Sequence, residues 1–168
     1  MKTWKWTMVL LVVALAGAGC VHKNTEKSPE TVAYQPVELS AAQLSAAQAA
    51  GADTEKIAEL EAKPLYTFSE ADVDVYLGYL RELKPNLRDR VQHLGQKNIG
   101  QPYEIYLLGE FPFETYDPQP LYCLDRSDCV VFAEHTLAMA LSKDWPSFFT
   151  TLQRIRYRSE EHTSELQS

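Results

Sequence analysis

The chain has 168 residues and a formal net charge of −7 at pH 7, with 16 basic and 23 acidic side chains. This length is enough for one modest domain. The acidic balance argues against a nucleic-acid partner, which would favour a basic protein face.

The first twenty residues are typical of an export signal. Lys2 and Lys5 supply the positive start, and the run MVLLVVALAGAG is apolar and ends in small residues. This run is too short to be a convincing membrane span. Small residues followed by Cys20 resemble a bacterial lipobox, in which the thiol is lipidated, while a plain secretory signal is the alternative. We therefore expect a lipoprotein of the bacterial cell envelope, anchored at Cys20 on the periplasmic side or the outer surface.

The next segment predicts a tether. Residues 21–38 are polar, contain proline and show no usable periodicity. Residues 39–63 are rich in Ala, Gln and Glu, so short helices are plausible there, but they offer little apolar surface to a core. We expect a disordered or helical tether over residues 21–63 and a folded domain over residues 64–157.

Two amphipathic helices are predicted at the start of this domain. The stretch FSEADVDVYLGYLREL, residues 68–83, has Ser69 as N-cap and Asp72 three residues later, much like a capping box. Its apolar residues recur at helical spacing. Lys84-Pro85-Asn86 ends this helix, and a second helix follows and ends near Gly95.

Residues 98–124 predict short strands or extended loops, because their aromatic side chains alternate with polar ones between several Gly and Pro residues. The stretch SDCVVFAEHTLAMALSKDW then predicts the best helix of the chain. Ser127 is the expected N-cap, and Asp128 lies in the first turn, where a carboxylate suits the positive end of the helix dipole. One face of this helix is mostly small or apolar and is predicted to pack inward against a sheet: Cys129, Phe132, Ala133, Thr136, Leu137 and Ala140.

Cys129 is the candidate nucleophile. A helix N-terminus favours the thiolate form of a cysteine, because backbone N–H groups stabilise its charge. The same N–H groups can bind a developing oxyanion. A buried structural cysteine is the simpler alternative. A disulfide between Cys123 and Cys129 is another, since the chain carries an export signal.

Three stretches, GQPYEIYLLGE, SDCVVFAEHTLAMAL and FFTTLQRIRY, together resemble the DUF1460 family of bacterial exported proteins. This family is described as N-acetylmuramoyl-L-alanine amidase-like and belongs to the NlpC/P60 superfamily of papain-like cysteine hydrolases. The most specific parts are the pairs Pro102-Tyr103 and Asp128-Cys129. The resemblance implies Cys129 as nucleophile, Tyr103 as a hydroxyl in the oxyanion region, and Asp128 as an orienting residue.

The resemblance covers about residues 68 to 157. It implies an α+β fold, of which this chain would hold the N-terminal helical half of a papain-like NlpC/P60 domain, with the following sheet mostly missing. It implies no metal ion and no cofactor. The expected partners are peptidoglycan peptides and, through the lipid anchor, the membrane, with no nucleic acid.

The base that activates the thiol should be a histidine. His22 lies in the tether, and His93 is expected on the surface of the second helix. His135 follows Cys129 by six residues on one helix, which places it about 120° around the axis from the thiol. In papain-like folds the histidine lies on a strand well downstream, and we expect that strand to be absent here.

The final residues, RSEEHTSELQS at 158–168, are polar and lack an apolar period. They can be written, codon for codon, as a widely used sequencing-library adapter. We therefore expect a non-native tail, in which His162 has no functional meaning.

Taken together, the sequence predicts a fragment of an exported cysteine hydrolase that cleaves amide bonds of cell-wall peptides, as a peptidoglycan amidase or endopeptidase. As given, the chain is expected to be inactive, because its catalytic histidine is absent. The alternative is a noncatalytic envelope lipoprotein that binds wall peptides or a protein partner.

Overall fold

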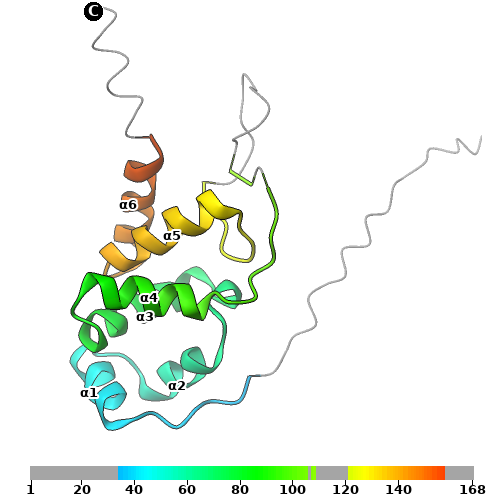
Figure 1. The fold of residues 1–168 in the computed structure, drawn as a ribbon. Coiled ribbons are helices and arrows are strands. Elements are labelled where there is room, and N and C mark those ends of the chain that lie inside the picture. The colour runs from blue at the N-terminus through cyan, green and yellow to red at the C-terminus, as the bar shows by residue number, and fades with distance from the viewer. Residues whose placement is uncertain (1–33, 106, 109–120, 158–168) are drawn as a thin grey trace, which may run out of the picture. The chain divides into compact units, whose positions relative to one another are not determined.

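The computed structural model describes residues 34–105, 107, 108 and 121–157, which form a helical unit (Figure 1). The helices within these ranges are α1 (Ala41–Ala49), α2 (Thr54–Ala62), the 3-10 turn η1 (Leu65–Thr67), α3 (Glu70–Leu83), α4 (Leu87–Lys97), α5 (Cys129–Leu141) and α6 (Trp145–Tyr157). The same ranges contain no β-strand, only an isolated parallel bridge between Tyr103 and Ser127. The predicted α+β class, with a papain-like sheet, is therefore wrong for the part of the chain that the structure describes.

Residues 98–124 were predicted as short strands or extended loops, and the residues of this segment that the structure describes form loops and not strands. Gly100 takes a positive φ of 91°, a conformation that interrupts an extended run. Pro102 follows and has no backbone N–H to donate to a ladder. What forms instead is a short contact between two loops: the N–H of Glu104 donates to the Ser127 carbonyl at 3.1 Å, and the N–H of Ser127 donates to the Pro102 carbonyl at 3.0 Å.

The core includes helices that the sequence analysis assigned to a tether. Ala47 on α1 and Ile57 and Leu60 on α2 are completely buried in the same cluster as the apolar face of α3. Alanine side chains are small, so α1 buries apolar surface without the large residues that signal a core helix. The folded unit therefore begins before Pro64, where its start was predicted.

The capping box of α3 is confirmed. The Ser69 hydroxyl accepts a hydrogen bond from the N–H of Asp72 at 3.2 Å, and the Asp72 carboxylate accepts one from the N–H of Ser69 at 3.0 Å. Asp72 also forms a 2.7 Å ion pair with Lys56 on α2. Its carboxylate thus starts α3 and fixes α2 against it.

A buried arginine joins the ends of two helices. Arg90 on α4 donates from Nε to the carbonyl of Ala140, near the end of α5, at 2.7 Å. From Nη1 it donates to the carbonyls of Lys84 and Pro85, just after α3, at 2.9 and 2.6 Å. No later turn of helix supplies an N–H group to these carbonyls. The guanidinium therefore provides the donors that are missing at the ends of α3 and α5.

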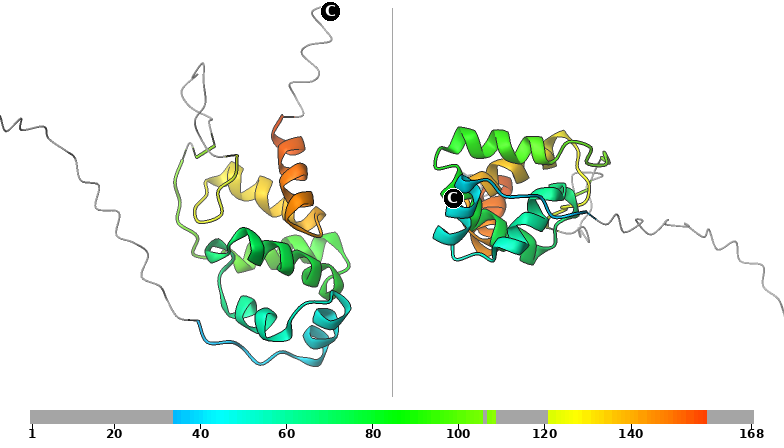
Figure 2. Two further views of the ribbon diagram at one scale, coloured as in Figure 1. Left: turned by 180° about the vertical axis from the view of Figure 1, so that it is seen from behind. Right: turned by 90° about the horizontal axis from the view of Figure 1, so that it is seen from below.

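Helix α5 packs against both α4 and α6 (Figures 1 and 2). Its buried residues are Val131, His135, Thr136, Ala138, Met139 and Ala140. The predicted inward face is therefore only partly right: Thr136 and Ala140 are buried, whereas Cys129, Phe132, Ala133 and Leu137 are exposed. Because α5 is apolar nearly all the way round, its sequence pattern could not select one face.

Residues 1–33 and 158–168 lie outside the described residues, and with them the predicted signal, Cys20, His22, His162 and the tail. Within the described ranges, every helix is too short or too polar to cross a lipid bilayer.

Candidate active site at the start of helix α5

Asp128 starts helix α5. It is the N-cap residue, and its Oδ1 accepts hydrogen bonds from the N–H groups of Val130 and Val131 at 2.9 and 2.8 Å. Ser127, which was predicted as the N-cap, lies one residue earlier and donates its hydroxyl to Gln101 instead. A carboxylate cap both satisfies two open donors and complements the helix dipole, so it stabilises this end of α5 more than a hydroxyl would.

Cys129 is the first residue of α5, and its thiol is free and exposed. The sequence analysis assigned the N–H groups of this turn to a thiolate or an oxyanion. In the structure, Asp128 occupies the N–H groups of Val130 and Val131. Asp128 does not bond to the N–H of Cys129. This N–H is therefore the donor of the first turn that can bind a carbonyl oxygen beside the thiol.

Tyr103 lies beside this helix start through its backbone. The bridge to Ser127 places Tyr103 next to the residue that stands two positions before Cys129. An ion pair between Arg126 and Glu104, at 2.8 Å, supports the same contact. The Tyr103 side chain is 71% exposed, so its hydroxyl is open to solvent and to a bound molecule.

Cys123 differs from Cys129 in its surroundings. It is half-buried, and its thiol donates to Asp125 Oδ1 at 3.2 Å. Burial, followed by the hydrogen bond to Asp125, raises the pKa of Cys123 to about 11. Both thiols are free in the structure, so the two cysteines are not joined by a disulfide there.

This difference predicts selective alkylation. With iodoacetamide at pH 7.5, we expect Cys129 to react at least about tenfold faster than Cys123, because only a thiolate attacks and Cys123 is held as a thiol. Peptide mass mapping of the folded protein over a time course measures the two rates, with the urea-unfolded protein as control. Equal rates in the folded protein would contradict the assignment.

His135 is a structural residue of α5. It is 4% exposed, its Nδ1 donates to the Val131 carbonyl at 2.9 Å, and its Nε2 accepts from the N–H of Cys123 at 3.2 Å. Burial lowers the pKa of His135 to about 4. The imidazole is therefore neutral at physiological pH, and both of its nitrogens are already bonded.

His93 is not the surface residue that the sequence predicted. It is half-buried on α4, and its Nε2 lies 2.7 Å from the hydroxyl of Tyr76 on α3. The same hydroxyl also contacts a carboxylate oxygen of Glu61 on α2, at 3.2 Å, so it lies between the carboxylate and the imidazole. Burial lowers the pKa of His93. The residue links three helices, and neither described histidine is available as a base.

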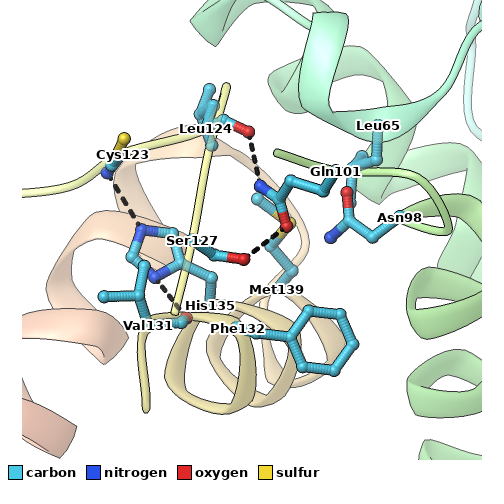
Figure 3. Close-up of a pocket in the computed structure, with 10 residues that line it drawn as sticks. All are labelled: Leu65, Asn98, Gln101, Cys123, Leu124, Ser127, Val131, Phe132, His135 and Met139. Carbon is cyan, nitrogen blue, oxygen red and sulfur yellow. Dashed lines mark hydrogen bonds between the residues drawn. The ribbon is translucent and has the colours of Figure 1, made fainter. Parts of the chain in front are cut away.

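A small pocket lies beside the start of α5 (Figure 3). Gln101 spans it: its Nε2 donates to the Leu124 carbonyl at 2.9 Å, and its Oε1 accepts from the Ser127 hydroxyl at 2.8 Å. Asn98, Val131 and Phe132 also line the wall. The pocket has room for about one water molecule. The described residues contain no cluster of side chains suited to hold a metal ion.

Residues 93–164 match the model of a family described as AmiA-like, N-acetylmuramoyl-L-alanine amidase-like. The matched stretch includes Tyr103, Asp128, Cys129 and the pocket residues Asn98 and Gln101, and it extends into the tail that begins at residue 158. The similarity to this amidase-like family therefore covers less than half of the chain. No curated protein and no solved structure matches the chain.

The pocket was not predicted from the sequence. Gln101 stands directly before the Pro102-Tyr103 pair, so its place in that motif was a usable signal. Asn98 offered none, because an asparagine after a predicted helix is common in any C-terminal turn.

Proposed function

We propose that this chain carries the nucleophile of a cysteine hydrolase that cleaves amide bonds in peptidoglycan peptides. The observation that carries the proposal is an exposed, free thiol at the first residue of a helix, inside the stretch that is similar to the amidase-like family. The resemblance to DUF1460 and NlpC/P60 proteins supports this chemistry, although the described residues do not form the papain-like sheet.

The proposed reaction is acyl transfer. The Cys129 thiolate attacks the amide carbonyl carbon, the amine leaves with a proton, and a thioester joins Cys129 to the acyl part of the peptide. Water then attacks the thioester and releases the acid and the thiol. In this proposal, the N–H of Cys129 and the hydroxyl of Tyr103 donate to the oxyanion; the exposure of Tyr103 and its backbone bridge to Ser127 support this role.

We assign the base of this reaction to a residue that is not among the described ones. The two described histidines, His93 and His135, are both hydrogen-bonded within the helical unit. The same observation favours a second function, in which the domain binds wall peptides without cleaving them. Loss of peptide hydrolysis on exchange of Cys129 for serine supports the enzyme, whereas binding without any hydrolysis by the full-length protein supports the second function.

We also propose that the protein is held at a membrane of the cell envelope by lipid on Cys20. Replacing Cys20 with alanine is expected to move the protein from the membrane fraction to the soluble envelope fraction, because the thiol that takes the lipid is gone. Fractionation with immunoblotting measures the shift, and Cys123→Ala is the matched control. A Cys20→Ala variant that still sediments wholly with membranes would show the anchor to be elsewhere.

A further inference from the structure

The backbone of Tyr103 has one side that its bridge to Ser127 does not use. In this parallel bridge, the N–H of Ser127 donates to the Pro102 carbonyl, and the N–H of Glu104 donates to the Ser127 carbonyl. The bridging groups therefore come from the two residues that flank Tyr103. Because successive residues of an extended chain turn their N–H and C=O groups to opposite sides, those of Tyr103 itself point away from Ser127.

The N–H and C=O of Tyr103 thus form a short open edge on the surface of the domain. Tyr103 is 71% exposed, and Pro102 and Glu104 beside it are exposed as well. Water can satisfy both groups in the free protein, so neither is a buried group without a partner. An exposed edge of this kind can take up an extended peptide as an added strand, because the peptide supplies one N–H and one C=O in return.

Contacts on both sides of Tyr103 hold this open edge in place. Before it, the side chain of Gln101 accepts a hydrogen bond from the Ser127 hydroxyl at 2.8 Å. After it, Glu104 forms the 2.8 Å ion pair with Arg126. Since the edge is already fixed in the free protein, a peptide that pairs with it does not have to order it, which lowers the entropic cost of binding.

The open edge lies within reach of the candidate nucleophile, and Figure 1 shows the segment after α4 passing the start of α5. Ser127 precedes Cys129 by two residues. With about 5 Å between paired backbones and about 3.8 Å between consecutive Cα atoms, the Cα atoms of Tyr103 and Cys129 are at most about 13 Å apart. A peptide residue paired with Tyr103 is then at most about 18 Å from Cys129, which about six residues of extended chain span.

We propose that an extended peptide substrate pairs its main chain with the N–H and C=O of Tyr103, so that a neighbouring amide is held at Cys129. The proposal rests on the proposed function and adds to it a binding edge that recognises main chain. Side chains stand roughly perpendicular to the hydrogen bonds of an extended backbone, so the Tyr103 hydroxyl keeps its own role. The paired position of the substrate tolerates different side chains, because none of them takes part in the pairing.

The test follows the amide proton of Tyr103. The probe is N-acetyl-tetra-alanine N-methylamide, titrated into the ¹⁵N-labelled full chain carrying Cys129→Ser, and the exchange of amide protons with water is measured by NMR. Saturating probe should slow the exchange at Tyr103 at least about tenfold, whereas Glu104 and Ser127, whose N–H groups are already bonded in the bridge, should change less than about twofold. Unchanged exchange at Tyr103 with millimolar probe would overturn the proposal.

Tyr103→Pro and Tyr103→Ala are the matched variants. Both remove the phenol, but only proline removes the N–H. The bridge does not use this N–H, and the extended Pro102 before it is the conformation that a following proline requires. Tyr103→Ala should keep the affinity for the probe within about threefold, whereas Tyr103→Pro should weaken it at least about tenfold.

Equal affinities of the two variants would contradict the pairing, provided that the Glu104 amide stays protected in both. If proline disturbs the bridge, the exchange at Tyr103 in the Cys129→Ser chain still decides the matter. Hydrolysis is measured separately. Full hydrolysis by Cys129→Ser would sink the proposed function, while a protected Tyr103 amide would still establish the peptide-binding edge. An unprotected Tyr103 amide in a protein whose hydrolysis needs Cys129 would overturn the edge alone.

Discussion

Exchange of Cys129 for serine is expected to lower peptide release from purified peptidoglycan by at least about 10³-fold in the full-length protein, with the fold unchanged. The change is nearly isosteric and lies on an exposed position, so packing is not disturbed. A serine hydroxyl is much harder to deprotonate than a thiol, and so it is a poor nucleophile at the same position. Chromatography of released peptides measures the activity, and circular dichroism measures the fold.

Cys123→Ser is the matched control for this experiment. A serine hydroxyl can keep the hydrogen bond that the Cys123 thiol makes to Asp125, so most activity should remain. Equal losses in the two variants would argue against Cys129 as the sole nucleophile and would favour a functional bond between the two sulfur atoms. Full activity of Cys129→Ser would remove the enzyme proposal altogether.

Replacing Arg90 with leucine is expected to destabilise the domain by about 3 kcal/mol or more. The substitution leaves three carbonyl oxygens, those of Lys84, Pro85 and Ala140, without the donors that Arg90 supplies. Loss of this magnitude lowers the melting temperature by about 10 °C for a domain of this size. Thermal unfolding followed by circular dichroism measures it.

Two further variants separate the hydrogen bonds from charge and side-chain size. Arg88→Leu removes an exposed arginine from the same helix and should change the free energy of unfolding by less than about 0.5 kcal/mol. Arg90→Lys should fall between the wild type and Arg90→Leu, because a single ammonium cannot reach all three carbonyls in the fixed geometry of a guanidinium. Equal stability of Arg90→Leu and Arg88→Leu would contradict the role given to Arg90.

Local signals in the sequence predicted local structure well. The Ser69–Asp72 capping box forms as expected, because both partners lie within one helical turn and need no distant contact. The core contribution of α1 was not predictable in the same way. Ala46 and Ala47 become buried only because α3 lies against them, and alanine shows the same pattern in a solvated helix as in a packed one.

The candidate site shows the same division. The positions of Asp128 and Cys129 at a helix start followed from neighbouring residues, although Asp128 and not Ser127 turned out to cap the helix. The contacts of His93 and the burial of Asn98 depend on tertiary packing. No spacing in the sequence encodes which histidine will be half-buried or which asparagine will be buried.

The bridge between Tyr103 and Ser127, with the ion pair of Arg126 and Glu104 beside it, joins the two ends of an internal stretch of chain. The residues just before α5 are therefore held to a segment that lies far from them in the sequence, at Tyr103 and Glu104. A change on either side of this bridge would thus reach the helix start that carries Cys129.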